Sequence, residues 1–326
     1  MIASIADPSQ VSAARRAATD FARANGFDET ATGRIAIVAT EMATNLLKHA
    51  SAGEIVIGRF ADRDGAGLEL LSLDKGPGIA DLGRAFEDGY STMGSQGSGL
   101  GALRRQSDHF AIWSRPGLGT AAVARFRQNG ATGAVMIGAV AQPYPGETVS
   151  GDAWSFGSPA AGPTLLMTDG SGHGPLAAIA AQASVKAFNA NLGGDCSRVV
   201  EAIHAALAPT RGAAVAVARA DVAQRLIRYV GIGNIAGAVV SQGAVRRMVS
   251  HNGTAGHIAP RIREFTYPWN GSATVILHSD GLSAKWDLDA YPGLAASHPS
   301  LIAGVLFRDF RRGRDDASIA VMRVAP

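Results

Sequence analysis

Residues 74–78 read Asp-Lys-Gly-Pro-Gly, and they directly follow a strand-like run of mostly apolar residues, Gly67–Leu73. An acid at a strand end followed by a glycine turn can present a carboxylate and backbone N–H groups to a ligand. A second glycine stretch, Gly-Ser-Gly-Leu-Gly at residues 97–101, precedes a short helical segment, Ala102–Gln106. Backbone N–H groups at a helix N-terminus bind phosphate oxygens. Together the two stretches indicate a site for a phosphate-bearing ligand, although each of them alone is common in flexible surface turns.

Two helices are expected ahead of this strand, one over residues 10–25 and a longer one that ends at about Ala50. In the longer helix Glu41, Asn45 and His49 are spaced four residues apart, so their side chains line one face. On an isolated helix, a row of an acid, an amide and an imidazole is most often a solvent-exposed face. Its position before the two glycine stretches favours a role in the same ligand site.

Four strand-like runs complete the N-terminal half of the chain. They are Glu54–Phe60, Gly67–Leu73, Phe110–Ser114 and Ala121–Phe126. With the helices they predict a two-layer α+β sandwich, in which helices cover one side of a mixed sheet. The polar, turn-prone stretch Arg127–Thr132 predicts a domain boundary after the last of these strands.

In order and spacing, the helical row and the two glycine stretches resemble the GHKL ATPases, which share the Bergerat fold and include gyrase, Hsp90, histidine kinases and MutL. The resemblance covers residues 1–127. Within it, the stretch Glu87–Thr92 is similar to the RsbT branch, the small serine kinases of bacterial partner switching. The resemblance implies that a domain over residues 1–130 binds ATP and Mg²⁺.

The resemblance also implies a role for each site residue. Asn45 would ligate Mg²⁺, for which a neutral amide oxygen is a suitable hard ligand, and Asp74 would accept a hydrogen bond from the adenine amino group. Glu41 would orient or deprotonate an attacking hydroxyl, although family relatives without kinase activity use this glutamate to activate water. The glycines expected to line the nucleotide are Gly76, Gly78, Gly97, Gly99 and Gly101.

The second half of the chain contains many short β-branched runs and two helical patterns, near Pro175–Asn191 and Ser197–Leu207. This pattern predicts a β-sandwich flanked by helices. Acid-bearing turns lie at the starts or ends of four of the strand-like runs. Their acids are Asp152, Asp169, Asp280 and Asp315.

A single Asp-Gly is usually only a turn, but four acid-bearing turns in one domain can converge in space. Converging carboxylates repel one another, so they persist only with bound protons or cations. Oxygen ligands favour Mg²⁺ or Mn²⁺. Two such ions ~4 Å apart can generate a hydroxide and clamp a phosphoryl group. The acids therefore indicate a site for two-metal hydrolysis.

The order of these turns resembles the metal-dependent (PPM) protein phosphatases of the SpoIIE type. The sequence Gly-Ile-Gly-Asn at residues 231–234 is similar to the RsbX branch of that family. The resemblance covers residues 133–326, and it implies an α-β-β-α sandwich that binds two Mn²⁺ or Mg²⁺ ions. It also implies that catalysis depends on Asp152, Asp169 and Asp280.

The metal ligands implied by the resemblance are Asp152, Asp169, the carbonyl of Gly170, Asp280 and Asp315. Asp316 is a less favoured alternative to Asp315. The chain departs from the larger eukaryotic relatives in one position, because Ser171 stands where they have a histidine that is proposed as the general acid. His173 could substitute for that histidine, or it could cap a helix or have another structural role.

Bulk composition limits the other classes of function. Hydrophobic residues make up 47% and charged residues 17% of the 326 residues, which suits two folded cores. The net charge of +3 is spread along the chain, so a nucleic-acid partner is not expected. The single cysteine, Cys196, fits a reducing compartment. Neither a signal peptide nor an apolar run long enough for a membrane span is recognisable, so a cytoplasmic location is expected.

The leading hypothesis is a bifunctional serine/threonine kinase and phosphatase that acts on one partner. By resemblance, that partner would be a STAS-domain protein of the anti-anti-sigma or stressosome type. In the alternatives, the N-terminal domain is a non-catalytic ATP sensor that gates the phosphatase, or a docking module that captures a regulator. The sequence makes no prediction about the oligomeric state.

Overall fold

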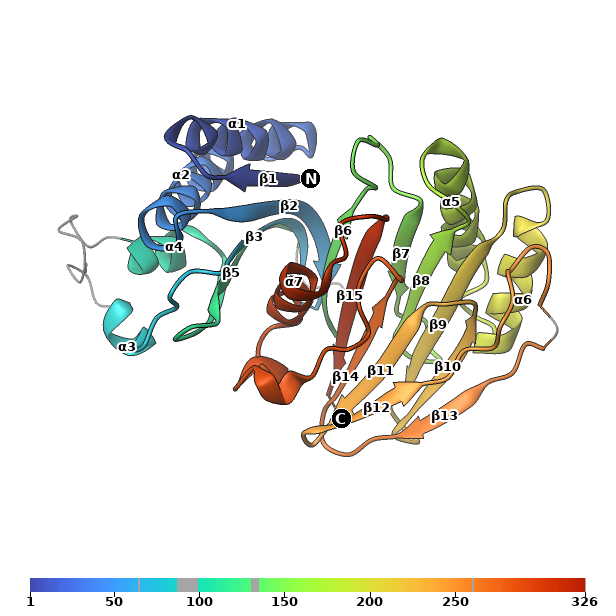
Figure 1. Cartoon of the computed structure of the whole chain (residues 1–326). Helices are drawn as coiled ribbons and strands as arrows, with labels where there is room; N and C mark the ends of the chain where they lie inside the picture. Colours follow the sequence, from blue (N-terminus) through green and yellow to red (C-terminus); the bar gives the residue numbers. More distant parts are fainter. Residues whose placement is uncertain (64, 87–98, 130–134, 260, 326) are drawn as a thin grey trace. The chain divides into compact units, whose positions relative to one another are not determined.

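The computed structural model describes residues 1–63, 65–86, 99–129, 135–259 and 261–325 (Figure 1). Contacts divide the chain into two compact units. The first unit contains Met1–Thr132 and a distant segment, Asp287–Arg308. The second contains Gly133–Trp286 and Asp309–Pro326. The chain therefore leaves the second unit after Trp286 and returns to it at Asp309.

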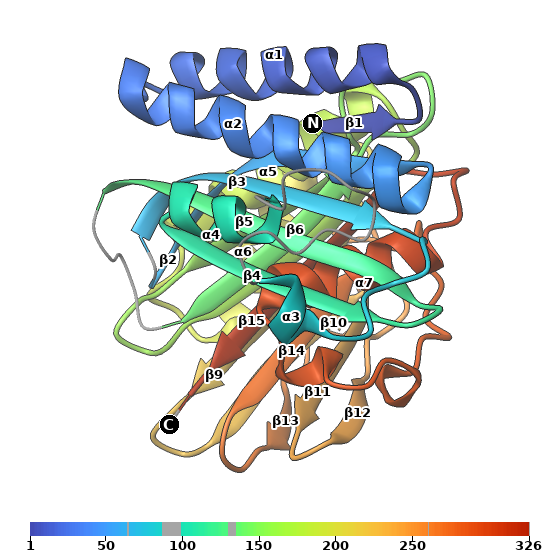
Figure 2. The same ribbon diagram turned by 90° about the vertical axis from the view of Figure 1, so that its left-hand side faces the viewer.

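Helices cover one face of a five-stranded sheet in the first unit (Figure 2). The helix α1 begins after Asp7, whose side chain accepts a hydrogen bond from the Ser9 N–H, and α2 begins after Asp28, which accepts from the Ala31 N–H. The elements of this unit are β1 (Ile2–Ile5), α1 (Pro8–Ala24), α2 (Glu29–Asn45), a π-helical turn (Leu46–Ala50), β2 (Gly53–Asp62), β3 (Gly65–Asp74), α3 (Leu82–Ala85), α4 (Gly99–Gln106), β4 (His109–Arg115), β5 (Gly119–Asn129), the 3₁₀ turns Leu288–Ala290 and Leu294–Ala296, and α7 (Pro299–Phe310) as far as Arg308.

The strands of this sheet follow the order β1-β2-β3-β5-β4, and every neighbouring pair is antiparallel. The prediction of a mixed sheet was therefore wrong. Consecutive strands join as the hairpins β2–β3 and β4–β5, and strands joined by a short turn must run in opposite directions. Alternate residues of β3 serve different faces, because Leu68 and Leu70 belong to the core that α1 and α2 cover.

The helix α7 covers the opposite face of this sheet, as Figure 1 shows. A Cβ atom added at Gly304 would lie 2.7 Å from Leu73 Cδ2 and 2.9 Å from Leu71 Cδ2, so the helix backbone approaches β3 closely. All residues from Pro299 to Arg308 are buried. The sequence patterns predicted two helices in the second half and missed this one. A helix that is apolar all round lacks the one-sided periodicity on which such predictions rest.

A buried ionic cluster joins α7 to the sheet. Arg125 in β5 is 0% exposed, and its guanidinium donates to Glu69 and to Asp62, each at 2.7 Å. Ser300 at the start of α7 donates to the same Glu69 oxygen at 2.7 Å. Burial alone would lower the pKa of Arg125, but the two carboxylates outweigh it and hold that pKa above its usual value. Arg125 therefore stays charged inside the unit.

The second unit is a sandwich of two antiparallel five-stranded sheets. One sheet has the order β13-β10-β9-β8-β7, and the other has the order β12-β11-β14-β15-β6. Its elements are β6 (Met136–Gln142), β7 (Asp152–Gly157), β8 (Thr164–Gly170), α5 (Pro175–Ala190), α6 (Cys196–Leu207), β9 (Ala213–Asp221), β10 (Leu226–Ile232), β11 (Ala236–Ser241), β12 (Ala244–Met248), β13 (Phe265–Pro268), β14 (Ala273–His278) and β15 (Ala317–Val324).

Two separate cores hold this sandwich together. One fills the space between the sheets and includes Met167, Tyr229 and Val275. The other lies between the first sheet and the helices α5 and α6, and it contains Cys196. Burial raises the pKa of the Cys196 thiol to about 12, so this residue is an unreactive small hydrophobe. None of the helices in the described ranges is long and apolar enough to cross a membrane.

The Arg125 cluster leads to a stability prediction. Replacing Arg125 with methionine leaves two buried acids without their counter-ion, and such a loss typically costs about 3–5 kcal/mol. We expect the free energy of unfolding of the first unit to fall by that order, measured by urea unfolding.

The matched control is Arg23→Met. Arg23 pairs with Asp20 at 3.6 Å, and these side chains are 69% and 75% exposed. A pair of this kind contributes at most about 1 kcal/mol. Similar unfolding curves for the two variants would show that the buried cluster does not stabilise the first unit.

Candidate nucleotide and metal sites

The predicted nucleotide residues Glu41 and Asn45 lie at the C-terminal end of α2. Glu41 and Asn45 are both partly exposed. The α-helix ends at Asn45, and the following residues, Leu46–Ala50, form a π-helical turn. Helical structure therefore ends at Ala50, as predicted, although its last turn is π-helical rather than α-helical. Such π-helical turns occur often at functional sites, and this one changes the helical register between Asn45 and His49.

Asp74 is the last residue of β3 and is 9% exposed. Its Oδ1 atom accepts hydrogen bonds from the Gly76 N–H at 2.8 Å and the Thr120 N–H at 3.1 Å. Burial raises the pKa of Asp74 above its usual value, although these N–H donors and the charges of Arg308 and His49 act in the opposite direction. The carboxylate is thus held in a fixed orientation at the end of the strand.

The turn after Asp74 requires its glycines. Gly78 has a φ of +75°, and a Cβ atom there would lie 2.0 Å from the carbonyl oxygen of Arg115. A Cβ atom at Gly76 would lie 2.8 Å from Ala50 Cβ. The Asp74–Gly78 turn therefore packs against the end of the π-helical turn. The structure thereby brings the two predicted motifs together.

The second glycine stretch is only partly described. Gly99 and Gly101 lie in the first turn of α4, which contacts α2. Gly97 and the RsbT-like stretch Glu87–Thr92 lie outside the described residues. The assignment of these glycines to phosphate binding stays a prediction.

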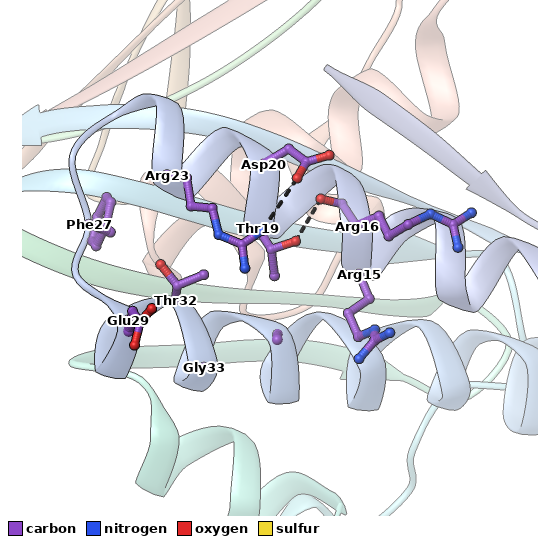
Figure 3. Close-up of a pocket in the computed structure, with 10 residues that line it drawn as sticks. Arg15, Arg16, Thr19, Asp20, Arg23, Phe27, Glu29, Thr32 and Gly33 are labelled. Carbon is purple, nitrogen blue, oxygen red and sulfur yellow. Dashed lines mark hydrogen bonds and ion pairs between the residues drawn. The ribbon is translucent and has the colours of Figure 1, made fainter.

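A cavity of about 570 Å³ lies elsewhere in the first unit, between α1 and α2 (Figure 3). It is lined by Arg15, Arg16, Thr19, Asp20, Arg23, Phe27, Glu29, Thr32, Gly33 and Ala36. None of these residues belongs to the predicted nucleotide site.

In the second unit, the predicted metal acids lie at strand ends. Asp152 begins β7 and pairs in register with Asp169 near the end of β8. Asp280 lies two residues beyond β14, and Asp315 and Asp316 directly precede β15. Because β14 and β15 are antiparallel neighbours in one sheet, the last three acids lie at the same end of this strand pair. The antiparallel ladders therefore determine where the carboxylates lie.

The acids act strongly on one another. Burial, followed by repulsion from Asp152, Asp280 and other acids, raises the pKa of Asp169 to about 9. The pKa of Asp152 is raised to about 7, again mainly by burial, with further contributions from Asp316 and Asp315. The pKa of Asp280 is also raised by burial and by the Asp315 charge. Such mutual effects mean that the four predicted acids belong to one cluster.

Two buried oxygens of this cluster have no hydrogen-bond partner among the described residues. They are Asp152 Oδ1 and Asp316 Oδ2. The other oxygen of each group is used, because Asp152 Oδ2 accepts from Ser279 Oγ at 2.6 Å and Asp316 Oδ1 accepts from the Tyr144 N–H at 2.8 Å. Buried carboxylate oxygens without partners are costly, and a cation is the partner that would satisfy them.

Asp316 is a stronger candidate for a metal ligand in the structure than the sequence indicated. It is 2% exposed, whereas Asp315 is partly exposed. A Cβ atom at Gly151 would lie 2.8 Å from Asp316 Oδ2, so this oxygen lies next to the start of β7. Asp315 Oδ1 instead accepts from the Asp316 N–H at 2.9 Å. Both acids are therefore candidates for a metal ligand.

The donor set fits ions that keep much of their water. Among the described residues, no three acidic, histidine or cysteine side chains come together closely enough to enclose an ion by themselves. Mg²⁺ usually keeps several waters and takes only one or two carboxylates, which suits two ions shared among these acids. With no sulfur or histidine in the cluster, Mg²⁺ or Mn²⁺ fits better than zinc.

Two further side chains belong to this region. Asn234, from the Gly-Ile-Gly-Asn motif, donates from Nδ2 to Asp280 Oδ2 at 2.7 Å. His173 pairs with Glu147 at 3.0 Å and stacks on the Tyr144 ring at a centroid distance of 4.2 Å. The cap of α5 is Gly174 and has no side-chain hydrogen bond, so His173 does not cap that helix. The resemblance suggested the Asn234 motif without its role, which the structure supplies.

Comparisons with known proteins agree with both halves. Residues 5–126 match the model of the histidine kinase-like ATPase domain, and residues 161–325 match that of Stage II sporulation protein E (SpoIIE). The serine/threonine-protein kinase RsbT of Bacillus subtilis (strain 168) is 39% identical over 108 residues, which are 33% of this chain and 81% of RsbT.

Solved structures share the fold as well. A chain from a structure of the bacterial stressosome, described as a modular system adapted to control secondary messenger signalling, superposes with a TM-score of 0.54 at 23% identity. That match covers 58% of this chain and 98% of the other. A crystal structure of RsbX in complex with magnesium superposes with a TM-score of 0.53 at 18% identity, covering 59% of this chain and 96% of RsbX.

The folds and the matches define a serine/threonine protein phosphatase of the PPM class joined to an RsbT-related, kinase-like ATPase domain. The predicted fold class is thereby confirmed. The chain belongs to the Stage II sporulation protein E family through its C-terminal half, and its N-terminal part belongs with RsbT among the histidine kinase-like ATPases.

The raised pKa values of the acids predict how stability changes with pH in metal-free protein. Folded Asp152 and Asp169 have pKa values of about 7 and about 9, above the value of about 3.9 for an unfolded aspartate. The folded state therefore binds more protons than the unfolded state between these values, so the free energy of unfolding falls as pH rises through this range.

This dependence can be measured by urea unfolding in chelator from about pH 5 to pH 9, the range in which these groups titrate. The free energy of unfolding of the Asp169→Asn variant should depend less on pH than that of the wild type. Added Mn²⁺ should stabilise the wild-type protein at the alkaline end of the range. Identical profiles for wild type and variant would contradict the cluster electrostatics.

The hydrogen bond from Asn234 to Asp280 leads to a prediction about metal affinity. The Asn234→Ala variant loses the hydrogen bond that orients Asp280, and outer ligand contacts of this kind typically change metal affinity by about 10–100-fold. We expect the Mn²⁺ concentration for half-maximal phosphatase activity to rise. Asn189→Ala is the matched control, because the Asn189 side chain accepts a hydrogen bond from Ser155 Oγ at 3.0 Å on the exposed surface. An unchanged Mn²⁺ dependence would remove Asn234 from the site.

Proposed function

We propose that this chain is a bifunctional regulator of partner switching. Its N-terminal unit would transfer phosphate from ATP to a serine or threonine of a STAS-domain protein, and its C-terminal half would remove that phosphate. The observation that carries the proposal is that one chain holds both an acid cluster with two unpartnered buried oxygens and an RsbT-like region with Asn45 and Asp74. Opposed activities on one residue form a reversible switch.

In the kinase reaction, the chain's own residues would bind and orient. Asp74, held by two backbone N–H groups, would accept from the adenine amino group. Asn45 would offer its amide oxygen to Mg²⁺. Glu41, one helical turn earlier, would orient the attacking hydroxyl or take its proton. ATP, when bound, supplies the phosphoryl group.

In the phosphatase reaction, the acids would hold two Mn²⁺ or Mg²⁺ ions. The ligands would be Asp152, Asp169, the Gly170 carbonyl, Asp280 and Asp315, with Asp316 as a further candidate. When bound, the ions supply a hydroxide and positive charge for the phosphoryl group. Ser279 orients Asp152, and Asn234 orients Asp280. These contacts would orient two of the proposed ligands.

The relatives support the proposed partner. RsbT is named as a serine/threonine-protein kinase, and one structural neighbour comes from the stressosome. Substrates of this class would present a serine or threonine hydroxyl on a STAS domain, of the anti-anti-sigma or stressosome type. We place the reaction in the cytoplasm, where the single Cys196 would stay reduced.

The segment Asp287–Arg308 favours a second candidate function. This segment lies within the SpoIIE match at residues 161–325, yet it packs in the first unit. The N-terminal unit would then be an ATP sensor or a partner-docking module that regulates the phosphatase without transferring phosphate.

One two-part assay separates these candidates. The full chain carrying Asp169→Ala is incubated with labelled ATP, Mg²⁺ and a STAS-domain protein, and labelled partner is measured. Wild-type protein and Mn²⁺ are then added and phosphate release is followed. Transfer that is lost in Glu41→Gln and Asn45→Ala, followed by release that needs Asp280, would support the bifunctional switch. Release without transfer, for every STAS protein tried, would leave only the sensor or docking function.

A further inference from the structure

The segment Asp287–Arg308 belongs to the ATPase-like unit, although it lies in the phosphatase half of the sequence. Its ends belong to the first unit, while the residues on both sides belong to the second. Asp280 lies seven residues before Asp287, and Asp315 lies seven residues after Arg308. A segment that packs in the ATPase-like unit is therefore bounded in sequence by two acids of the phosphatase cluster.

This segment is firmly attached to the first unit. Ser300 bonds to Glu69 within the buried Arg125 cluster, and Trp113 Nε1 donates to the Pro292 carbonyl oxygen at 3.1 Å. Gly304 allows α7 to approach β3 at van der Waals distance. Buried, satisfied polar contacts at several points along a segment make it move with the sheet to which it is bonded.

Arg308 connects α7 to the predicted nucleotide site through hydrogen bonds. The residue is 7% exposed. Its guanidinium donates from Nη1 to the Asp74 carbonyl oxygen and from Nη2 to the Leu118 carbonyl oxygen, the latter at 2.9 Å. One planar group thus joins the end of β3 to the turn that begins β5. Gly119 makes room for it, because a Cβ atom there would lie 2.8 Å from Nη1 and 2.2 Å from the Asp74 carbonyl oxygen.

The same two strand ends hold the Asp74 carboxylate. The Thr120 N–H, two residues after Leu118, donates to Asp74 Oδ1. A shift of Arg308 would therefore move the carbonyl of Asp74 and the donor to its side chain together. In addition, the positive charge of Arg308 favours the ionised form of Asp74, which is the form that accepts from an exocyclic amine.

We propose that Arg308 is a positioning residue of the nucleotide site, and that through it nucleotide bound at Asp74 changes the phosphatase activity of the same chain. The proposal rests on the proposed function in one respect, the location of the nucleotide at Asp74. The helix α7 belongs to the first unit as far as Arg308, and its last two residues, Asp309 and Phe310, belong to the second. Any ligand that prefers one position of Arg308 will bias α7, and coupling of this kind acts equally in both directions.

The experiment uses the full-length chain and two readouts. Affinity for a non-hydrolysable ATP analogue is measured by calorimetry with Mg²⁺. Hydrolysis of p-nitrophenyl phosphate is measured at a fixed free Mn²⁺ concentration, with and without saturating analogue. The variants are Arg308→Met and Arg308→Lys. Arg246→Met is the matched control, because exposed Arg246 also donates to a backbone carbonyl, that of Pro268 at 2.9 Å.

We expect Arg308→Met to bind the analogue at least about tenfold more weakly, as loss of a charge-assisted hydrogen bond does. Arg308→Lys should retain part of the affinity, because one carbonyl keeps a charged donor. The analogue should change the wild-type hydrolysis rate by about fivefold or more, a usual size for coupling between sites. In Arg308→Met, saturating analogue should leave the rate unchanged, whereas Arg246→Met should behave as wild type.

Each other outcome has a distinct meaning. Wild-type protein that does not bind the analogue would refute the proposed nucleotide site itself. Binding by wild type with equal affinity in Arg308→Met would overturn the positioning role. Binding that leaves the wild-type hydrolysis rate unchanged would overturn the coupling. If Arg308→Met does not fold, Arg308→Lys carries the test, and full wild-type affinity for the analogue with a full wild-type change in rate in that variant would refute the positioning role.

Discussion

Repulsion among the clustered carboxylates is the constraint that determines the chemistry of the candidate metal site in the second unit. The ladder of β7 with β8 holds Asp152 beside Asp169, and Asp280 and Asp316 lie at one end of the neighbouring strands β14 and β15. Like charges held together in a buried place either bind protons or require a cation. The raised pKa values and the two unpartnered oxygens are two consequences of this one arrangement. The acid cluster therefore lowers the stability of the folded unit unless protons or metal ions neutralise its charge.

The first unit contains buried charge of the opposite kind. Arg125 meets two carboxylates and a hydroxyl, so no charge in that cluster lacks a partner. A fully paired cluster has little capacity to bind a ligand, and it tends to specify one packing arrangement. The two clusters thus differ in whether their buried charges are paired with protein groups. Arg125 orders α7 on the sheet, whereas the acids of the second unit remain available to an ion.

The sequence predicted most of the local features and few of the long-range ones. Turn chemistry is local, so the acids at strand ends and the Asp74–Gly78 turn were recognisable from neighbouring residues. The antiparallel order of the first sheet was not, because pairing is decided by tertiary contacts. The bond from Arg308 to Asp74 spans 234 positions, and no periodicity reports such a contact. The helix α7 was missed because it is buried on every side.

The position of α7 also changes what counts as the ATPase-like part of this chain. The match to that domain ends at residue 126, yet the second face of its sheet is covered by residues 287–308. Without them, Leu71 and Leu73 would lose the helix that packs on them, and Glu69 would lose its bond to Ser300. Exposing apolar surface and unpairing a buried acid are both destabilising. In this chain the ATPase-like unit therefore needs residues from the phosphatase half of the sequence to complete its own core.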